Sequence, residues 1–215
     1  MNRTVADILS LLLIAATITL TLIFYADLPD PMPTHWNAAG EVDGYMPKPW
    51  GVIALPFAAI FVFLLMKFVA HVLRRKPGGD EAGPVLSLFQ LVMVAFMSGV
   101  AALVLFEAKG YDTGMDRLIP GGVGVLFLVI GHSFGKVRRN KFMGIRTPWT
   151  LANDEVWDRT HRLGSKLFML AGLLLLAYAS TGVYLGWTLV AVFALLLFSL
   201  PYSYFVHRSA RNNAD

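Results

Sequence analysis

The side chains best suited to chemistry lie in one polar interval of the chain, residues 131–166. One face of a helix through this interval would carry two carboxyls, an imidazole and a hydroxyl, from Asp154, Asp158, His161 and Ser165. Such a set could act as a proton relay or as a cation site. A solvated helix face has the same composition, and this is the interpretation that the spacing favours.

Two further histidines are candidates for chemistry. His132 lies near the inner end of an apolar run, where an ionisable side chain is either functional or held by a structural hydrogen bond. His35 is close in sequence to Glu41 and Asp43, and one imidazole with two carboxylates could bind a metal ion. Because these three residues have no helical register, a folded loop is the preferred interpretation.

The sequence lacks the patterns of the common enzyme classes. There is no cysteine, which excludes disulfides, thiolate zinc sites and cysteine nucleophiles. There is no His-Glu-x-x-His and no pair of carboxylates within an apolar run. Ser133 beside His132 is read as neither a triad nor a nucleophile elbow. We therefore expect no enzyme activity, no cofactor and no metal.

The composition is that of a membrane protein. Of the 215 residues, 56% are hydrophobic and 15% are charged, whereas about a quarter of the residues of a soluble domain are charged. The formal net charge of +4 could suggest a nucleic-acid partner, but the basic residues of membrane proteins collect in loops that face the cytoplasm. We therefore expect membrane lipid as a partner and no direct contact with nucleic acid.

Six apolar segments are long enough to cross a bilayer, which takes about 20 helical residues. They cover residues 5–25, 51–72, 84–106, 118–135, 164–185 and 187–206, with a bare turn near Gly186. The expected fold class is all-α, a polytopic integral membrane protein with six transmembrane helices. The spacing Gly131-x-x-x-Gly135, and likewise Gly182-x-x-x-Gly186, is typical of close helix contacts.

The distribution of lysine and arginine predicts the orientation. With the N-terminus inside, the cytoplasmic pieces contain 14 of these residues, and the opposite side contains Lys48, Lys109 and Arg117. Under the positive-inside rule, both termini are then cytoplasmic. A cleaved signal peptide over residues 1–25 is disfavoured, because the apolar run is longer than a signal peptide needs and no small-x-small site follows.

Two sequence units are expected. Residues 1–72 form an N-terminal two-span unit with an extracytoplasmic loop at 26–50, and residues 84–207 form a four-span unit with a cytoplasmic loop at 136–163. Prolines give the outer loop an extended path, and Trp36 and Trp50 suit the headgroup level of a membrane. Lys67, near the end of the second span, is expected to snorkel to the interface.

Local signals place a helix start in the cytoplasmic loop. Pro148 disfavours helical geometry at the preceding residue, so residues 146–149 are not expected to form regular helix. Asn153 is a good N-cap and is followed by two acidic residues at the positive end of the helix dipole. The helix should then continue into the fifth span, supported by the pairs Glu155–Arg159 and Asp158–Arg162.

Two stretches resemble a known family. Residues 144–162 contain Gly-Ile-Arg-Thr-Pro-Trp-Thr-Leu, then Glu-Val-Trp and Thr-His-Arg, and resemble the signature of the SdpI family of bacterial membrane proteins. Residues 28–44 are similar to the small uncharacterised domain that commonly precedes it. The resemblance singles out Gly144, Arg146, Thr147, Pro148, Trp149, Thr150, Asn153, Glu155, Trp157, His161 and Arg162. In the outer loop it singles out His35, Trp36, Asn37, Gly40 and Asp43.

The resemblance implies immunity to an exported antimicrobial peptide toxin at the bacterial cytoplasmic membrane. It also implies signal transduction, in which the toxin-engaged protein holds a cytosolic transcriptional repressor. In one departure from the family pattern, Ala152-Asn153 replaces two small hydroxyl residues, although asparagine keeps the capping chemistry. The alternative function is a small transporter or a lipid- or peptide-handling protein, which the scarcity of acidic residues in the spans disfavours.

Overall fold

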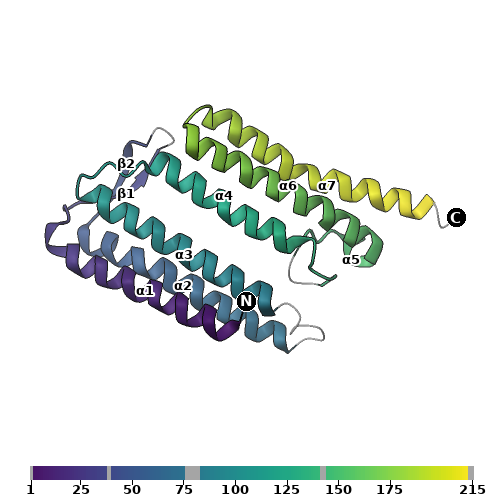
Figure 1. Ribbon diagram of the computed structural model, residues 1–215, viewed down its shortest axis with the longest axis horizontal. Coiled ribbons are helices and arrows are strands. Elements are labelled where there is room, and N and C mark those ends of the chain that lie inside the picture. The colour runs from purple at the N-terminus through teal and green to yellow at the C-terminus, as the bar shows by residue number, and fades with distance from the viewer. Residues whose placement is uncertain (1, 38–39, 76–82, 141–143, 213–215) are drawn as a thin grey trace. The chain divides into compact units, whose positions relative to one another are not determined.

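The computed structural model is mostly helical and describes residues 2–37, 40–75, 83–140 and 144–212 (Figure 1). Within these residues, six helices are long and apolar enough to cross a membrane, which confirms the predicted spans. They are α1 (Arg3–Phe24), α2 (Lys48–Arg74), α3 (Gly83–Ala108), α4 (Met115–Phe134), α6 (Asp154–Thr181) and α7 (Leu185–Asn212). Lys76 and Lys141, which were counted for the orientation, lie outside the described residues.

The chain forms two compact units, residues 1–119 and residues 120–215. In the first unit, α3 packs against both α1 and α2, so that three long helices lie side by side (Figure 1). In the second unit, α6 packs along α7, and the short helix α5 (Pro148–Ala152) contacts both. The sequence units expected at residues 1–72 and 84–207 remain a prediction.

The predicted outer loop contains a β-hairpin, which the all-α expectation did not include. After a 3-10 turn, η1 (Tyr25–Asp27), strand β1 (Met32–Trp36) pairs antiparallel with β2 (Val42–Met46). The register shifts on both sides of His35. The path is extended, as the prolines predict, but the irregular register leaves no clean apolar–polar alternation that would have marked two strands in the sequence.

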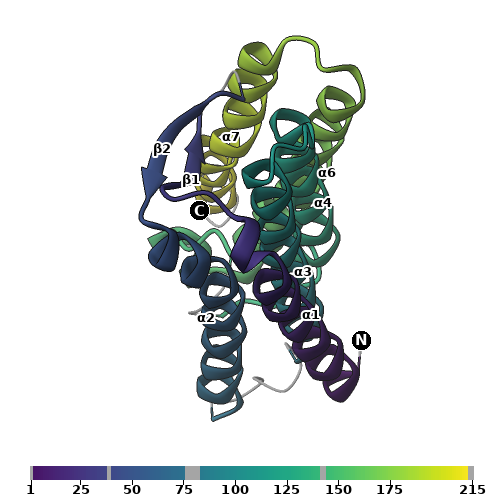
Figure 2. The ribbon, with the colours of Figure 1, turned by 90° about the vertical axis from the view of Figure 1, so that its left-hand side faces the viewer.

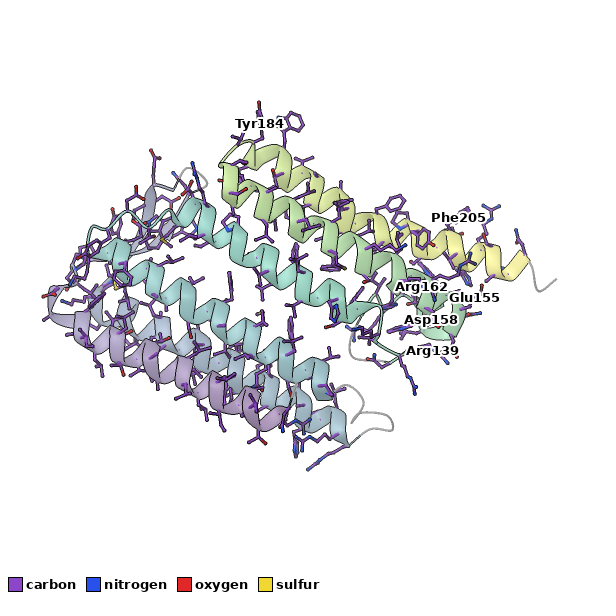
Figure 3. All side chains as sticks on the ribbon, viewed as in Figure 1. Arg139, Glu155, Asp158, Arg162, Tyr184 and Phe205 are labelled. Carbon is purple, nitrogen blue, oxygen red and sulfur yellow. The ribbon has the colours of Figure 1, made fainter. Side chains whose placement is uncertain are left out.

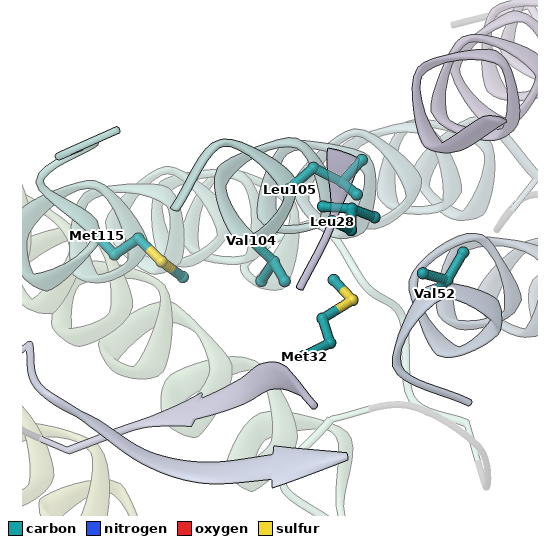
Figure 4. Close-up of a cluster of buried hydrophobic side chains, with 6 residues drawn as sticks. All are labelled: Leu28, Met32, Val52, Val104, Leu105 and Met115. Carbon is teal, nitrogen blue, oxygen red and sulfur yellow. The ribbon is translucent and has the colours of Figure 1, made fainter. Parts of the chain in front are cut away.

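The hairpin rests on a small apolar core of the first unit. Met32 of β1 is fully buried. The side chains around it come from the loop, α2, α3 and the start of α4, namely Leu28, Val52, Val104, Leu105 and Met115 (Figure 4). A Cβ added to Gly51 would lie 3.2 Å from the Met32 side chain, so α2 begins directly against the hairpin. Burial of such a side chain contributes about 1.5–3 kcal/mol to the packing of the hairpin against the helices.

Two boundaries differ from the prediction. α4 begins at Met115 rather than at residue 118, so Pro120 lies inside the helix. The turn between α6 and α7 is built by Gly182 and Tyr184, with φ of 70° and 65°, while Gly186 lies inside α7. Glycine ends α6 because the left-handed C-cap carries no steric cost for it. A Cβ on Gly186 would meet nothing within 4 Å, so the close contact expected there is absent.

Glycines bring α4 and α6 close together in the second unit, as the spacing at Gly131 predicts. A Cβ added to Gly124 would lie 2.8 Å from the carbonyl oxygen of Gly172. One added to Gly131 would lie 2.7 Å from the side chain of Met169. The Ser165 hydroxyl donates a hydrogen bond of 2.6 Å to the Gly131 carbonyl. Small residues and such bonds hold membrane helices together because lipid offers little hydrophobic drive for their association.

A polar cluster joins the three long helices of the first unit. The Asp7 carboxylate of α1 accepts hydrogen bonds from Lys67 Nζ of α2, at 2.5 Å, and from Gln90 Nε2 of α3, at 3.0 Å. The Gln90 amide also lies 3.4 Å from the hydroxyl of the fully buried Ser10. Lys67 therefore does not simply snorkel, because an acid on α1 gives it a partner.

We predict that Asp7→Leu destabilises the first unit, because the Lys67 ammonium and the Gln90 amide both lose their acceptor. The expected cost is about 0.5–2 kcal/mol, measured as a lower Tm of the purified protein in detergent. Thr19→Leu, at an exposed position of the same helix, should leave the Tm unchanged. An Asp7→Leu protein that melts with the wild type would contradict the role of the cluster.

Candidate functional site

The polar interval forms a connector, residues 135–153, between α4 and α6 in the second unit. Residues 141–143 of this connector lie outside the described part of the chain. Figure 3 shows Arg139, Glu155, Asp158 and Arg162 gathered at one end of this unit, beside α5. The folded connector and the first turns of α6 together make the candidate site.

Two threonines build the turn at which α5 begins. Thr147 is extended, with φ −86° and ψ 160°, and caps the helix, while Pro148 occupies a first-turn position. The side chain of Thr147 accepts from the Thr150 N–H at 3.3 Å, and that of Thr150 accepts from the Thr147 N–H at 2.9 Å. The expectation that residues 146–149 avoid helix is wrong at Pro148 and Trp149, because proline restrains the residue before it but is itself suited to start a helix.

Asn153 begins α6, as predicted. Its Oδ1 accepts a hydrogen bond of 3.1 Å from the Val156 N–H, and the helix runs without interruption to Thr181. The predicted pair Glu155–Arg159 is present, at 3.2 Å.

A different ion pair replaces the predicted Asp158–Arg162 pair, which is not formed among the described residues. Arg139 of the connector bonds the carboxylate of Asp154 through Nε at 2.5 Å. It also donates to the Leu151 carbonyl at 2.6 Å. One guanidinium thus joins the connector to the end of α5 and the first turn of α6.

His161 is the centre of the connector's fold. Its side chain is buried, and its ring stacks on Trp157 with 3.9 Å between ring centroids. Nδ1 donates to the Trp157 carbonyl at 2.9 Å, and Nε2 accepts the Ile145 N–H at 3.0 Å. Since a backbone N–H can bond only an unprotonated ring nitrogen, the two bonds require a neutral imidazole with its hydrogen on Nδ1.

The four polar residues predicted to share a face of α6 therefore form no proton relay, and only part of that face is exposed to solvent. His161 is turned to the connector, Ser165 bonds to Gly131, and Asp154 pairs with Arg139. Asp158 alone of the four fits the expectation of an exposed side chain without such a bond. The physical reason is that the connector folds back over α6 and covers part of a surface that a lone helix would expose.

Gly144 allows this fold. Its φ is 109°, a conformation that side chains disfavour. A Cβ there would overlap Nε2 of His161 and lie 3.0 Å from the ring of Trp157. Trp157 is itself fully buried and donates from Nε1 to the Val137 carbonyl at 2.8 Å. The connector is thus fixed to one turn of α6 at two points, Val137 through Trp157 and Ile145 through His161.

Trp149 fixes α5 to α7. Its Nε1 donates to the Ser203 hydroxyl at 2.9 Å. Its ring meets Tyr204 edge-on, with 5.5 Å between centroids, and stacks on His207 at 6.1 Å. The two tryptophans of the signature are therefore anchors within the second unit.

The solvent-exposed surface of the site is charged. Arg146, Glu155 and Arg162 are exposed, in contrast to the buried Thr150, Trp157 and His161. An open pocket of about 480 Å³ in the same unit is lined by Arg138, Arg139, Asn140, Leu151, Asp154 and Asp158. Guanidinium and carboxylate groups held on a rigid frame can form charge-assisted hydrogen bonds to a polar partner.

His132 and Ser133 do not form a catalytic pair. His132 is exposed in the last turn of α4, and its Nε2 accepts a hydrogen bond of 2.8 Å from Lys136. Residues 131–135 read Gly-His-Ser-Phe-Gly, which has the spacing of a nucleophile elbow. An elbow, however, places the serine between a strand and a helix, whereas Ser133 lies within α4.

In the outer loop, the structure pairs the predicted residues across the hairpin. The imidazole Nδ1 of His35 contacts the Asp43 carboxylate. Asn37 donates to the Glu41 carboxylate at 3.0 Å, and Gly40 turns the chain with φ of 80°. The candidate metal-binding residues are therefore in two separate contacts: His35 contacts Asp43, whereas Glu41 bonds Asn37.

The two loop tryptophans differ. Trp36 is half-buried and packs against the core around Met32, whereas Trp50 is 67% exposed. Only Trp50 therefore fits the expectation of a ring at the headgroup level.

Some residues that hold the site were not predicted. The spacing Thr147-x-x-Thr150 is a signal for a capping pair, which could have been read from the sequence. Ser203 and Val137 carry no such signal, because they meet Trp149 and Trp157 only through the tertiary fold.

Six apolar helices and a charged, folded connector define a polytopic membrane protein. Residues 136–205 match the SdpI/YfhL protein family, and residues 12–60 match a domain of unknown function, DUF1648. The second unit thus carries an SdpI/YfhL family region and the first carries the DUF1648 domain that precedes it, which confirms the resemblance seen in the sequence.

A protein of Bacillus subtilis (strain 168) named Immunity protein SdpI is 23% identical to this chain over 192 residues. The match covers 89% of this chain and 90% of that relative. No solved structure matches the chain.

We predict that Gly144→Ala loosens the connector. A methyl group cannot fit between the backbone and the His161 ring, and φ of 109° is strained for alanine; strain of this kind costs about 1–3 kcal/mol. Faster proteolysis of the connector in the purified protein would report the change. Gly110→Ala is a matched control, because Gly110 has φ of 86° but open space around it. Equal cleavage of Gly144→Ala and wild type would contradict the fit.

We also predict that acid releases the connector. Protonating Nε2 of His161 replaces an acceptor by a donor and breaks the bond from Ile145, so this stability is present where His161 is neutral and is lost as the pH falls through its protonation. Hydrogen exchange at the Ile145 amide, corrected for its intrinsic pH dependence, should accelerate only as the pH falls below about 6.5, the ordinary value for histidine. His161→Gln should remove this response, whereas His132→Gln should keep it. Constant protection in the wild type would refute the assignment.

Proposed function

We propose that this protein is a membrane immunity and signal-transduction protein, which protects a bacterial cell against an exported antimicrobial peptide toxin. In this proposal the connector and the start of α6 hold a cytosolic transcriptional repressor when the toxin is engaged on the opposite side. The proposal assigns no catalysis and no cofactor.

One observation carries the proposal. The signature residues divide into a buried set, which fixes the connector to α6, and a set whose side chains are exposed at the surface. Thr150, Trp157 and His161 are buried and hydrogen-bonded within the second unit, while Arg146 and Arg162 are exposed. A surface that is rigid before binding loses little conformational entropy when a partner docks, which is the property expected of a recognition site.

The similarity to a protein named Immunity protein SdpI supports the same function. The match extends over both units and includes the outer hairpin as well as the connector, so an outward sensor and an inward docking surface would occur in one chain. Toxin binding on one side could then change repressor binding on the other only if the two sides are coupled in free energy.

The orientation is part of the proposal. The excess of lysine and arginine on one side, 14 against three, favours a cytoplasmic connector and cytoplasmic termini in the inner membrane. The hairpin of residues 32–46 then faces the exterior, where an exported peptide would arrive.

We predict that Arg146→Ala abolishes protection while membrane insertion stays intact. The test is survival of a sensitive strain that expresses the protein and is exposed to the toxin. Arg146→Ala should lower survival about tenfold or more, since a charge-assisted hydrogen bond lost from an interface costs about 1.5–3 kcal/mol. Arg211→Ala, an exposed arginine in the last turn of α7, should protect like the wild type.

The abundance of each variant and its orientation in the membrane are measured in the same strains. The chain has no cysteine, so single thiols introduced at Asn140 and Tyr45 can be labelled selectively from either side of the membrane. Full protection by Arg146→Ala at normal abundance would refute the role of Arg146 in protection. Labelling of both thiols from one side would refute the orientation.

A further inference from the structure

Strand β2 is the outer strand of the hairpin in the first unit. β1 lies against α2 and α3 and buries Met32. On β2, Tyr45 is 59% exposed and Met46 is 45% exposed, and Figure 2 shows β2 on the outer side of β1. We propose that the outer edge of β2 receives an extended, cationic segment of an exported peptide as a third strand.

The backbone makes β2 the receptive edge. In an antiparallel pair, alternate residues direct their N–H and C=O groups away from the partner strand. The sheet has two strands in the described part of the chain, so β2 has a neighbour on one side only. β1 contains Pro33 and follows Pro31, which remove donors from that strand, whereas residues 42–46 contain no proline. Peptides commonly bind by adding a strand to such an edge.

The charge around the edge selects the occupant. Residues 26–50 contain four carboxylates, from Asp27, Asp30, Glu41 and Asp43, and one lysine, Lys48. Asp27 pairs with Lys109 at 2.9 Å, so the other three carboxylates supply the negative charge near the hairpin. Lys48 is directed to the loop backbone, where Nζ donates to the Leu28 carbonyl at 2.7 Å and lies 4.9 Å from the Tyr25 ring centroid. Asp43 lies on β2 itself, with a side chain that is 45% exposed. A third strand that carries lysine or arginine meets complementary charge along this edge.

The same negative charges disfavour two other partners for the β2 edge, a second copy of this chain and an anionic lipid surface. A second copy of this chain that paired β2 with β2 would bring two negatively charged loops together, which is the arrangement that natural edge strands use against self-association. An anionic lipid surface is repelled for the same reason. A basic peptide is the occupant that gains from both the backbone and the charge.

This inference rests on the proposed function only in taking the peptide to be an exported one, and binding can be measured without that assumption. The probe is a fluorescent synthetic nonapeptide of alternating threonine and valine with two lysines, added to the purified full-length protein in lipid nanodiscs of neutral lipid. Two further probes carry N-methyl groups on one or the other alternate set of amides, and a fourth replaces both lysines by glutamate.

Strand addition predicts that one N-methylated probe binds like the parent and that the other binds about tenfold more weakly or worse, since only one set of amides faces β2. The glutamate probe should also bind at least about tenfold more weakly. Asp43→Asn, which keeps an oxygen for His35, should weaken the parent probe about threefold to tenfold, and Glu155→Gln in the second unit should not.

Equal binding of the two methylated probes would overturn the strand-addition mode. Equal binding of the lysine and glutamate probes would overturn the charge selection. Probe binding that follows the prediction in a protein that gives no survival advantage would leave the edge site standing and would reject the immunity function, so the two failures are distinguishable.

Discussion

The hydrogen bond from the Ile145 N–H to Nε2 of His161 is the contact on which the connector depends. A chain that leaves one membrane helix and enters the next must satisfy its backbone groups at the edge of the bilayer, where water is scarce. Here a neutral histidine, buried under Gly144 and stacked on Trp157, supplies the acceptor. The bond closes the connector on α6, so that the threonine cap and the Trp149 anchor can form on the same frame.

Polar side chains inside apolar helices specify the packing of both units. In the first, Asp7 joins three helices through Lys67 and Gln90. In the second, Ser203 holds Trp149, and Ser165 holds the Gly131 carbonyl. Apolar side chains distinguish poorly between lipid and protein, so in a membrane the small and polar residues decide which helix faces meet.

Much of the fold could be predicted because its signals are local. Length and hydropathy defined the six spans, and cap chemistry at Asn153 defined the start of α6. The hairpin was missed because its strands are short and irregular in register. His161 was assigned to a solvated face because helical spacing shows which residues share a face, but not whether another segment covers it. The site residues named from the family signature were located by the structure, but the division into buried anchors and exposed charges required tertiary contacts such as Trp149 with Ser203.

The turn between α6 and α7 has a consequence for biosynthesis. It consists of Gly182, Val183 and Tyr184, none of them charged, between two apolar helices that pack along each other. Moving so short and uncharged a segment through the hydrocarbon layer requires the transfer of little polar surface. In the proposed orientation this turn crosses the bilayer, and α6 and α7 can enter it together as a preformed helical hairpin.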